Sequence, residues 1–139
     1  MNNPIRIVVA AALISKDKKI LIAQRPKGKH MQGFWEFPGG KLEAGESPEQ
    51  ALVRELSEEL GILVLEKDLE PFTFASHVYE DFHLLVLLYI CENWQGIPEG
   101  KEEQEIAFAH VNELLNYNFL PSNIKMLHQI IDFLSPVVL

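Results

Sequence analysis

Residues 40–62 read GKLEAGESPEQALVRELSEELGI, and this stretch decides the fold. Ser47 is a favourable N-cap residue for a helix, and Gln50 completes a capping box with it. Strong helix formers then continue until Gly61, which suits a left-handed C-terminal cap. Pro48 suits the first position of the helix, so the stretch predicts a tight glycine loop that leads into a helix over 48–60, of about three turns.

Two faces of the predicted helix carry different chemistry. Leucines recur at every fourth position and form an apolar stripe that can pack on a sheet. Glu55, Glu58 and Glu59 stand at i, i+3 and i+4, so their carboxylates converge on another face. The helix offers them no lysine partner, and Arg54 is its only cation. Carboxylates gathered in this way favour a site for Mg²⁺ or Mn²⁺, while a solvated face with ordinary ion pairs is the alternative.

The spacing of these residues resembles the Nudix box. Gly40 is followed after five residues by Glu46, and after seven more by the run Arg54–Ile62, which reads RELSEELGI. Agreement at every fixed position of so long a pattern is far more specific than a short glycine motif. The resemblance implies an α/β fold, namely a Nudix-type α/β/α sandwich with a central mixed sheet and the Nudix loop-helix. It also implies a metal-dependent enzyme that hydrolyses a nucleoside diphosphate linked to another moiety.

Length, charge and cysteine content bound the class of protein. A chain of 139 residues predicts a single domain over 1–139. Its net charge of −8, without a basic stripe, argues against a nucleic-acid polymer as partner but not against a small nucleotide. Cys91 is the only cysteine, which favours a reducing cytoplasm. Since no apolar run is long enough to span a membrane, we expect a cytoplasmic protein without a membrane partner, with monomer and homodimer both open.

Outside the box, the hydrophobic pattern predicts strands and one further helix. The expected strands are 5–14, 20–24, 34–37, 62–65, 72–79, 83–91 and 106–111. We expect the strands 5–14 and 20–24 to form one hairpin, and 72–79 and 83–91 to form another. The expected helical segments after the box are a short turn at 112–115 and a final helix over 123–134, which Pro121 and Ser122 begin.

The resemblance assigns roles to the box residues. Glu58 and Glu59 match metal ligands, and Glu55 matches a residue that binds metal or helps to activate water. Arg54 matches an arginine that orients these carboxylates, a task that suits its planar guanidinium better than a lysine. Glu46 matches the remaining box glutamate, for which a structural and a catalytic role are equally open.

The similarity extends beyond the box to the MutT-like subgroup of the family. Short matching segments follow in a common register, namely Phe37–Lys41, Trp94–Gly96, Gly100–Glu102 and Pro121-x-Asn123. By this register Glu102 is the metal-binding or general-base glutamate outside the box, with a solvated loop charge as the alternative. Gly39 would offer its carbonyl oxygen to the metal, although the glycines at 39–40 also permit the turn into the helix.

The same resemblance implies a substrate-binding set, which consists of Arg25, Phe37, Lys41, Asp81 and Asn123. Lys41 would contact phosphate. Asn123 would read a purine, because its side-chain amide can donate and accept at once. Near a helix start, however, an asparagine is more often a capping residue.

The other members of this set would enclose the nucleoside. Arg25 and Phe37 would complete the pocket, and a place in the core is the alternative for Phe37. Asp81 would lie near the nucleoside. Phe82 stands where the MutT-like subgroup has an arginine, and this departure bears on the preference for a base.

The hypothesis that follows is metal-assisted hydrolysis of a nucleoside triphosphate to the monophosphate and pyrophosphate. The resemblance favours 8-oxo-dGTP and a role in cleaning the nucleotide pool before DNA replication. The metal would lower the pKa of a bound water, and Glu55 or Glu102 would take its proton. Other Nudix substrates are the alternative, including another dNTP, CTP-like nucleotides, ADP-ribose and dinucleoside polyphosphates. A nucleotide sensor without catalysis is a further alternative, which the intact box disfavours.

Overall fold

The computed structural model describes residues 3–135. The strands are β1 (Ile5–Leu13), β2 (Lys19–Gln24), β3 (Trp35–Glu36), β4 (Gly39–Lys41), β5 (Glu70–Val78), β6 (His83–Cys91) and β7 (Ile106–His110). The helices are α1 (Pro48–Leu60), the 3₁₀ helices η1 (Glu66–Asp68) and η2 (Leu114–Asn116), and α2 (Pro121–Leu134). Among residues 3–135, none of these helices has the length and apolar character needed to cross a membrane.

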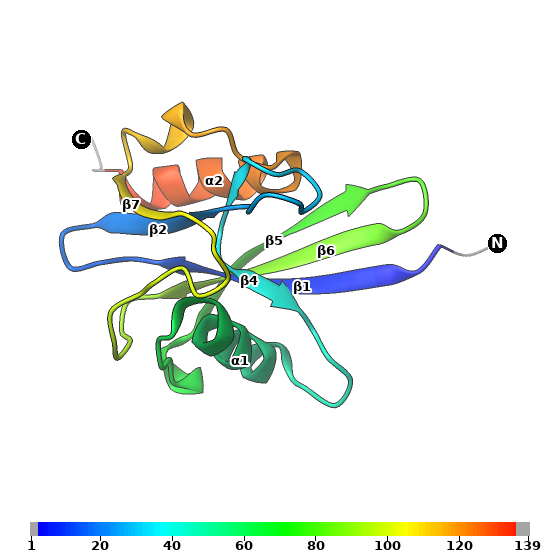
Figure 1. The fold of residues 1–139 in the computed structure, drawn as a ribbon, viewed down its shortest axis with the longest axis horizontal. Helices are drawn as coiled ribbons and strands as arrows, with labels where there is room; N and C mark the ends of the chain where they lie inside the picture. The colour runs from blue at the N-terminus through cyan, green and yellow to red at the C-terminus, as the bar shows by residue number, and fades with distance from the viewer. Residues whose placement is uncertain (1–2, 136–139) are drawn as a thin grey trace.

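Strand β1 lies in the middle of the molecule and is buried on both faces over its C-terminal half. Val9 and Ala11 belong to the core cluster that contains α1, whereas Ala10 and Ala12 belong to the cluster that contains α2. Because successive side chains of a strand point to opposite faces, a strand covered on both sides needs a continuous apolar sequence. Helices α1 and α2 therefore lie on opposite faces of the sheet (Figure 1), which confirms the predicted α/β/α sandwich.

The central sheet is mixed, as predicted. Its strand order is β4-β1-β6-β5, with β1 parallel to β6 and the other pairs antiparallel. The hairpin expected from 72–79 and 83–91 is confirmed as β5 and β6. On the other side of β1, Val8 pairs with Lys41 and Ala10 with Gly39. This pairing fixes the glycines that precede α1 at an edge of the sheet.

The hairpin expected from 5–14 and 20–24 is wrong. Strand β2 belongs instead to a second, three-stranded sheet of order β3-β2-β7. The ends of β1 and β2 are joined by an isolated bridge between Ile14 and Ile20 and by the turn hydrogen bond from the Ser15 N–H to the Lys19 carbonyl. The physical reason is that both edges of β1 are already occupied by β4 and β6, so β2 must find its hydrogen-bond partners elsewhere.

Several smaller expectations also change. The brief strand expected at 62–65 is reduced to an isolated bridge between Leu63 and Gln95. The turn expected at 112–115 is η2, which begins two residues later. By contrast, the start of helix α2 at Pro121 is confirmed, because proline fits the first turn of a helix, where its missing N–H has no partner to lose.

The predicted ends of α1 are confirmed. The Ser47 side chain accepts the backbone N–H of Gln50 at 3.1 Å, and the Gln50 side chain accepts the backbone N–H of Ser47 at 2.9 Å. At the other end, Gly61 adopts a left-handed conformation with φ of 70° and donates its N–H to the carbonyl oxygen of Ser57. Both ends of the helix that carries the box glutamates are therefore fixed by local sequence.

The leucine stripe of α1 offers a test of the fold. Leu56 is fully buried, in a cluster with the other two stripe leucines and with Val9 and Ala11. We expect Leu56→Ala to lower the free energy of unfolding by about 2–5 kcal/mol, because it removes buried methyl groups and leaves a cavity. Leu63→Ala is the matched control, since that side chain is 49% exposed. Chemical denaturation measures both, and similar losses in the two variants would contradict the packing described here.

Candidate metal and nucleotide site

The glycines of β4 allow close approach between the sheet and α1. A Cβ atom at position 39 would overlap the backbone carbonyl oxygen of Val9, and one at position 40 would overlap the carboxylate of Glu55. Gly39 also donates its backbone N–H to the Glu59 carboxylate at 3.3 Å. The loop therefore places its backbone directly beside two of the predicted metal-binding carboxylates.

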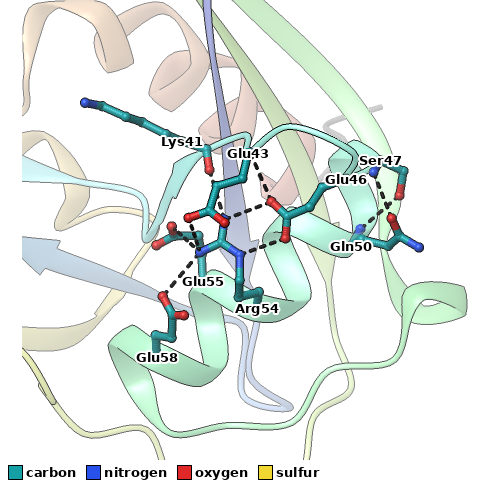
Figure 2. Close-up of polar contacts among 8 residues, drawn as sticks. All are labelled: Lys41, Glu43, Glu46, Ser47, Gln50, Arg54, Glu55 and Glu58. Carbon is teal, nitrogen blue, oxygen red and sulfur yellow. Dashed lines mark hydrogen bonds and ion pairs between the residues drawn. The ribbon is translucent and has the colours of Figure 1, made fainter.

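Arg54 organises the glutamates of the box, as Figure 2 shows. Its Nε and Nη2 donate to the two carboxylate oxygens of Glu46 at 2.7 and 3.0 Å. Its Nη1 donates to Glu55 at 2.9 Å and to Glu58 at 3.2 Å. Nη2 also donates to the backbone carbonyl of Lys41 at 3.1 Å, which ties α1 to the end of β4. The geometry fits the predicted orienting role of Arg54.

The hydrogen bond from Arg54 keeps the pKa of Glu46 below its usual range. Glu46 also accepts the backbone N–H of Glu43 at 3.0 Å. A cavity lies beside the box glutamates, and neither Glu46 nor Arg54 is among the described residues that line it. Of the two roles left open for Glu46, this placement favours the structural one.

Glu59 is the buried carboxylate of the site. It is only 8% exposed. Burial first, and then the nearby charges of Glu36, Glu102 and Glu55, together raise its pKa to about 8. A buried carboxylate among other carboxylates is costly unless a proton or a cation neutralises it. Glu59 is therefore the position at which a bound cation would contribute most to stability.

Glu102 lies in the loop that follows β6 and lines the same cavity. Its backbone N–H donates to the side-chain carbonyl of Gln104 at 2.8 Å. Gln104 is itself buried and donates to the backbone carbonyl of Glu59 at 3.1 Å. Sequence reasoning missed Gln104, which links the Glu102 loop to the end of α1.

A cavity of about 890 Å³ joins the carboxylates to the predicted substrate residues. This volume is of the size that small-molecule sites occupy. The metal-site members of its lining are Gly39, Glu55, Glu58, Glu59 and Glu102, and the substrate-site members are Arg25, Phe37, Lys41, Asp81 and Asn123. The Lys41 side chain points away from the Arg54 cluster in Figure 2, while its carbonyl oxygen faces that cluster. Both predicted sets therefore share one space.

Asn123 is buried in the wall of this cavity at the start of α2. Its Oδ1 accepts the backbone N–H of Phe37 at 3.2 Å, and its Nδ2 donates to the Ser122 hydroxyl at 3.2 Å. The capping alternative is not realised, because the helix has no side-chain cap and begins before Asn123. The Phe37 ring is 3% exposed and packs edge to face on Phe119, so its side chain is mainly core, as the alternative expectation had it.

Arg25 is held by a partner that sequence reasoning missed. Its Nη1 donates to the Glu36 carboxylate at 3.2 Å, and its Nε donates to the backbone carbonyl of His30. Burial raises the pKa of Glu36, and the Arg25 charge opposes this rise. Glu36 lies in β3, two residues before the proline of the loop, and lines the cavity. The available signal was an acidic residue between two aromatic residues, Trp35 and Phe37, in an expected strand.

The residues present fit a divalent metal ion. The donor set is made of carboxylate oxygens, which Mg²⁺ and Mn²⁺ prefer, and the charge of Glu59 is left without a cationic partner among residues 3–135. As they stand in the same part of the chain, however, no three acidic, histidine or cysteine side chains lie together closely enough to hold a metal ion. Glu55 and Glu58 are hydrogen-bonded to Arg54, so a cation would share them with the guanidinium.

The raised pKa of Glu59 predicts how stability depends on pH. The folded protein keeps the Glu59 proton up to about pH 8, whereas an unfolded glutamate releases it near pH 4.5. The folded state therefore binds more protons between these values, and its stability falls as the pH rises through them. For metal-free protein we expect Glu59 to contribute a loss on the order of a few kcal/mol between pH 5 and pH 9.

Urea denaturation at several pH values, with a chelator present, measures this loss. Glu59→Gln should flatten the dependence, and Glu66→Gln, an exposed glutamate in η1, should leave it unchanged. Added Mg²⁺ should restore stability at pH 9 in the unsubstituted protein and in Glu66→Gln, but not in Glu59→Gln. An equal pH dependence in the unsubstituted protein and Glu59→Gln would contradict the burial of this charge.

Comparison with known proteins gives a consistent result. The family model described as "NUDIX domain" matches residues 9–129. The 8-oxo-dGTP diphosphatase of Haemophilus influenzae is 39% identical over 128 residues, which cover 91% of this chain and 92% of that protein. The CTP pyrophosphohydrolase of Escherichia coli is 41% identical over 123 residues, which cover 87% of this chain and 88% of that protein.

Solved structures agree with these sequences. A structure from a study of MutT of Aliivibrio salmonicida and Vibrio cholerae superimposes with a TM-score of 0.81 at 37% identity, covering 93% of this chain and 98% of its own. The solution structure of the Escherichia coli ORF135 protein gives a TM-score of 0.82 at 34% identity. This match covers 94% of this chain and 91% of that protein. The fold is therefore shared with proteins that are also similar to this chain in sequence.

Proposed function

Because the chain belongs to the Nudix family of pyrophosphohydrolases, we propose that it hydrolyses 8-oxo-dGTP to 8-oxo-dGMP and pyrophosphate. The observation that carries this proposal is the single cavity that joins the box carboxylates to Asn123. Relatives named 8-oxo-dGTP diphosphatase, at 39% and 37% identity, support it. The cellular role would be removal of an oxidised nucleotide before it enters DNA.

The chain's own residues divide the work. Glu55, Glu58, Glu59 and Glu102 would hold the metal, together with the Gly39 carbonyl. When bound, the metal, Mg²⁺ or in its place Mn²⁺, supplies charge neutralisation at the phosphates and acidifies water. Glu55 or Glu102 would accept the proton of the attacking water. Arg54 would keep Glu55 and Glu58 oriented, as positioning residues do in metal sites.

The substrate residues would act on the other parts of the nucleotide. Lys41 would contact phosphate through its ammonium group, which is a compact charge suited to that task. Asn123 would present its Nδ2 to the base, because its Oδ1 already accepts from Phe37. Arg25 and Asp81 would border the nucleoside. The positions of the four side chains around one cavity support this division.

CTP is the second candidate substrate. The Escherichia coli CTP pyrophosphohydrolase is 41% identical to this chain, which is as similar as the diphosphatases are. Phe82 also departs from the arginine expected at its position and lines the cavity. A pyrimidine substrate would use the same carboxylates and the same phosphate contacts.

The test is kcat/KM for 8-oxo-dGTP, dGTP and CTP with Mg²⁺ and coupled inorganic pyrophosphatase. We expect 8-oxo-dGTP to exceed dGTP by at least about a hundredfold, provided that buried groups read the oxidised base. A clear preference for CTP would replace 8-oxo-dGTP with the second candidate. Tight binding without turnover of any nucleotide, in Mg²⁺ or Mn²⁺, would contradict both.

A further inference from the structure

Arg6 lies on the cavity side of β1. Arg6, Val8 and Ala10 occupy every second position of the strand and therefore lie on one face of it. All three residues line the cavity. Leu84 and Val86 of the neighbouring strand β6 continue the same surface, because Arg6 pairs with Leu84 and Val8 with Val86. These two strands therefore give the cavity a floor of small and aliphatic side chains, with the Arg6 cation at its edge.

An aromatic stack holds this cation. The guanidinium carbon of Arg6 lies 4.1 Å from the centroid of the Phe82 ring. The Tyr79 ring stacks on the Phe82 ring, with the two ring centroids 4.8 Å apart and an interplanar angle of 24°. Backbone hydrogen bonds fix both ends of the arrangement, from Tyr79 N–H to the Phe82 carbonyl and from His83 N–H to the Pro4 carbonyl.

The hydrogen-bond donors of Arg6 remain available to a ligand. No carboxylate within the described range forms an ion pair with Arg6, and no described residue accepts a hydrogen bond from its side chain. A guanidinium carries five N–H donors and no acceptor. A cation that is packed against an aromatic ring at a cavity edge, with its donors free, is suited to recognise an acceptor on a bound ligand.

We propose that Arg6 is a specificity-determining residue that recognises a keto oxygen of the substrate's base, with Phe82 as its positioning residue. The inference rests on the proposed nucleotide function. Since Arg6 only donates, it favours a base with a carbonyl oxygen at this edge and disfavours an exocyclic amino group, which also donates. Val8 and Ala10, which follow Arg6 on the cavity side of β1, provide an apolar surface on which a flat base can lie.

Binding of deoxynucleoside monophosphates tests the proposal without requiring turnover. The probes are dIMP and dAMP, because hypoxanthine carries a carbonyl oxygen where adenine carries an amino group. Calorimetry would give Kd for both in the unsubstituted protein, in Arg6→Met, in Phe82→Leu and in Phe82→Tyr. Lys16→Met is the matched control, since it removes one exposed charge from the turn at the opposite end of β1.

We expect the unsubstituted protein to bind dIMP about tenfold more tightly than dAMP, as one good contact to a base edge allows. Arg6→Met and Phe82→Leu should bring the ratio of the two constants close to one, while Phe82→Tyr and Lys16→Met should preserve it. An unchanged ratio in Arg6→Met, even with a lower melting temperature, would show that the contact between Arg6 and Phe82 serves only stability, and it would overturn the proposal.

A parallel measurement with inorganic pyrophosphate separates recognition of the base from binding of phosphate. Arg6→Met should leave the inhibition constant of pyrophosphate unchanged. Equal weakening of dIMP, dAMP and pyrophosphate would show that Arg6 binds phosphate and would overturn the proposal. If no triphosphate is hydrolysed but the dIMP preference depends on Arg6, the proposed catalytic function fails and this inference stands.

Discussion

Glu59→Gln should lower kcat/KM for nucleotide hydrolysis by about a thousandfold or more in saturating Mg²⁺. The substitution keeps the size of the side chain and an oxygen that can accept the Gly39 N–H. It removes only the charge, at the position where burial and three neighbouring carboxylates make a cation most favourable. The expected loss is therefore one of metal-dependent chemistry rather than of folding.

The stability of the variant supports this distinction. Because Glu59→Gln removes a buried ionisable group, metal-free variant protein should be at least as stable as the unsubstituted protein at pH 9. Glu58→Gln should also lose activity, but it should leave the pH dependence of stability unchanged, since its side chain is 57% exposed. Glu66→Gln is the control for both readouts. Full activity in Glu59→Gln or Glu58→Gln would contradict the metal site.

The local features of the site could be predicted from the sequence. Both ends of α1 and the facing of its leucines depend on residues within a few positions of one another, and these are confirmed. The family is confirmed because the box fixes many positions in one short stretch. Signals of this kind need no knowledge of the tertiary structure.

The features that were missed depend on contacts between distant residues. Gln104 reaches the Glu59 carbonyl from 45 residues away, and nothing in the sequence around it indicates that contact. The failed hairpin has the same origin, because the pairing of β1 with β6 and β4 leaves no edge for β2. Glu36 likewise acquires its importance from Arg25 and from the nearby Glu59.

Arg54→Ala should lower kcat/KM by about 10- to 100-fold, which is the typical effect of removing a residue that hydrogen-bonds to metal ligands. Its guanidinium makes the hydrogen bonds that fix Glu46, Glu55 and Glu58, so its removal frees all three carboxylates. Arg54→Lys should rescue little, because an ammonium cannot make the bidentate contact to Glu46 while also reaching Glu55. The concentration of Mg²⁺ needed for half-maximal activity should rise in both variants.

A double-mutant cycle separates this positioning role from a purely structural one. Arg54→Ala, Glu55→Gln and the double variant are compared in kcat/KM at saturating Mg²⁺, together with their stabilities in chelator. If Arg54 acts through Glu55, the double variant should lose little more than Glu55→Gln alone, because coupled residues are not additive. Additive losses in kcat/KM, or losses that follow stability alone, would contradict the role. The hydrogen bond of 2.9 Å between the two side chains is the physical basis for expecting the coupling.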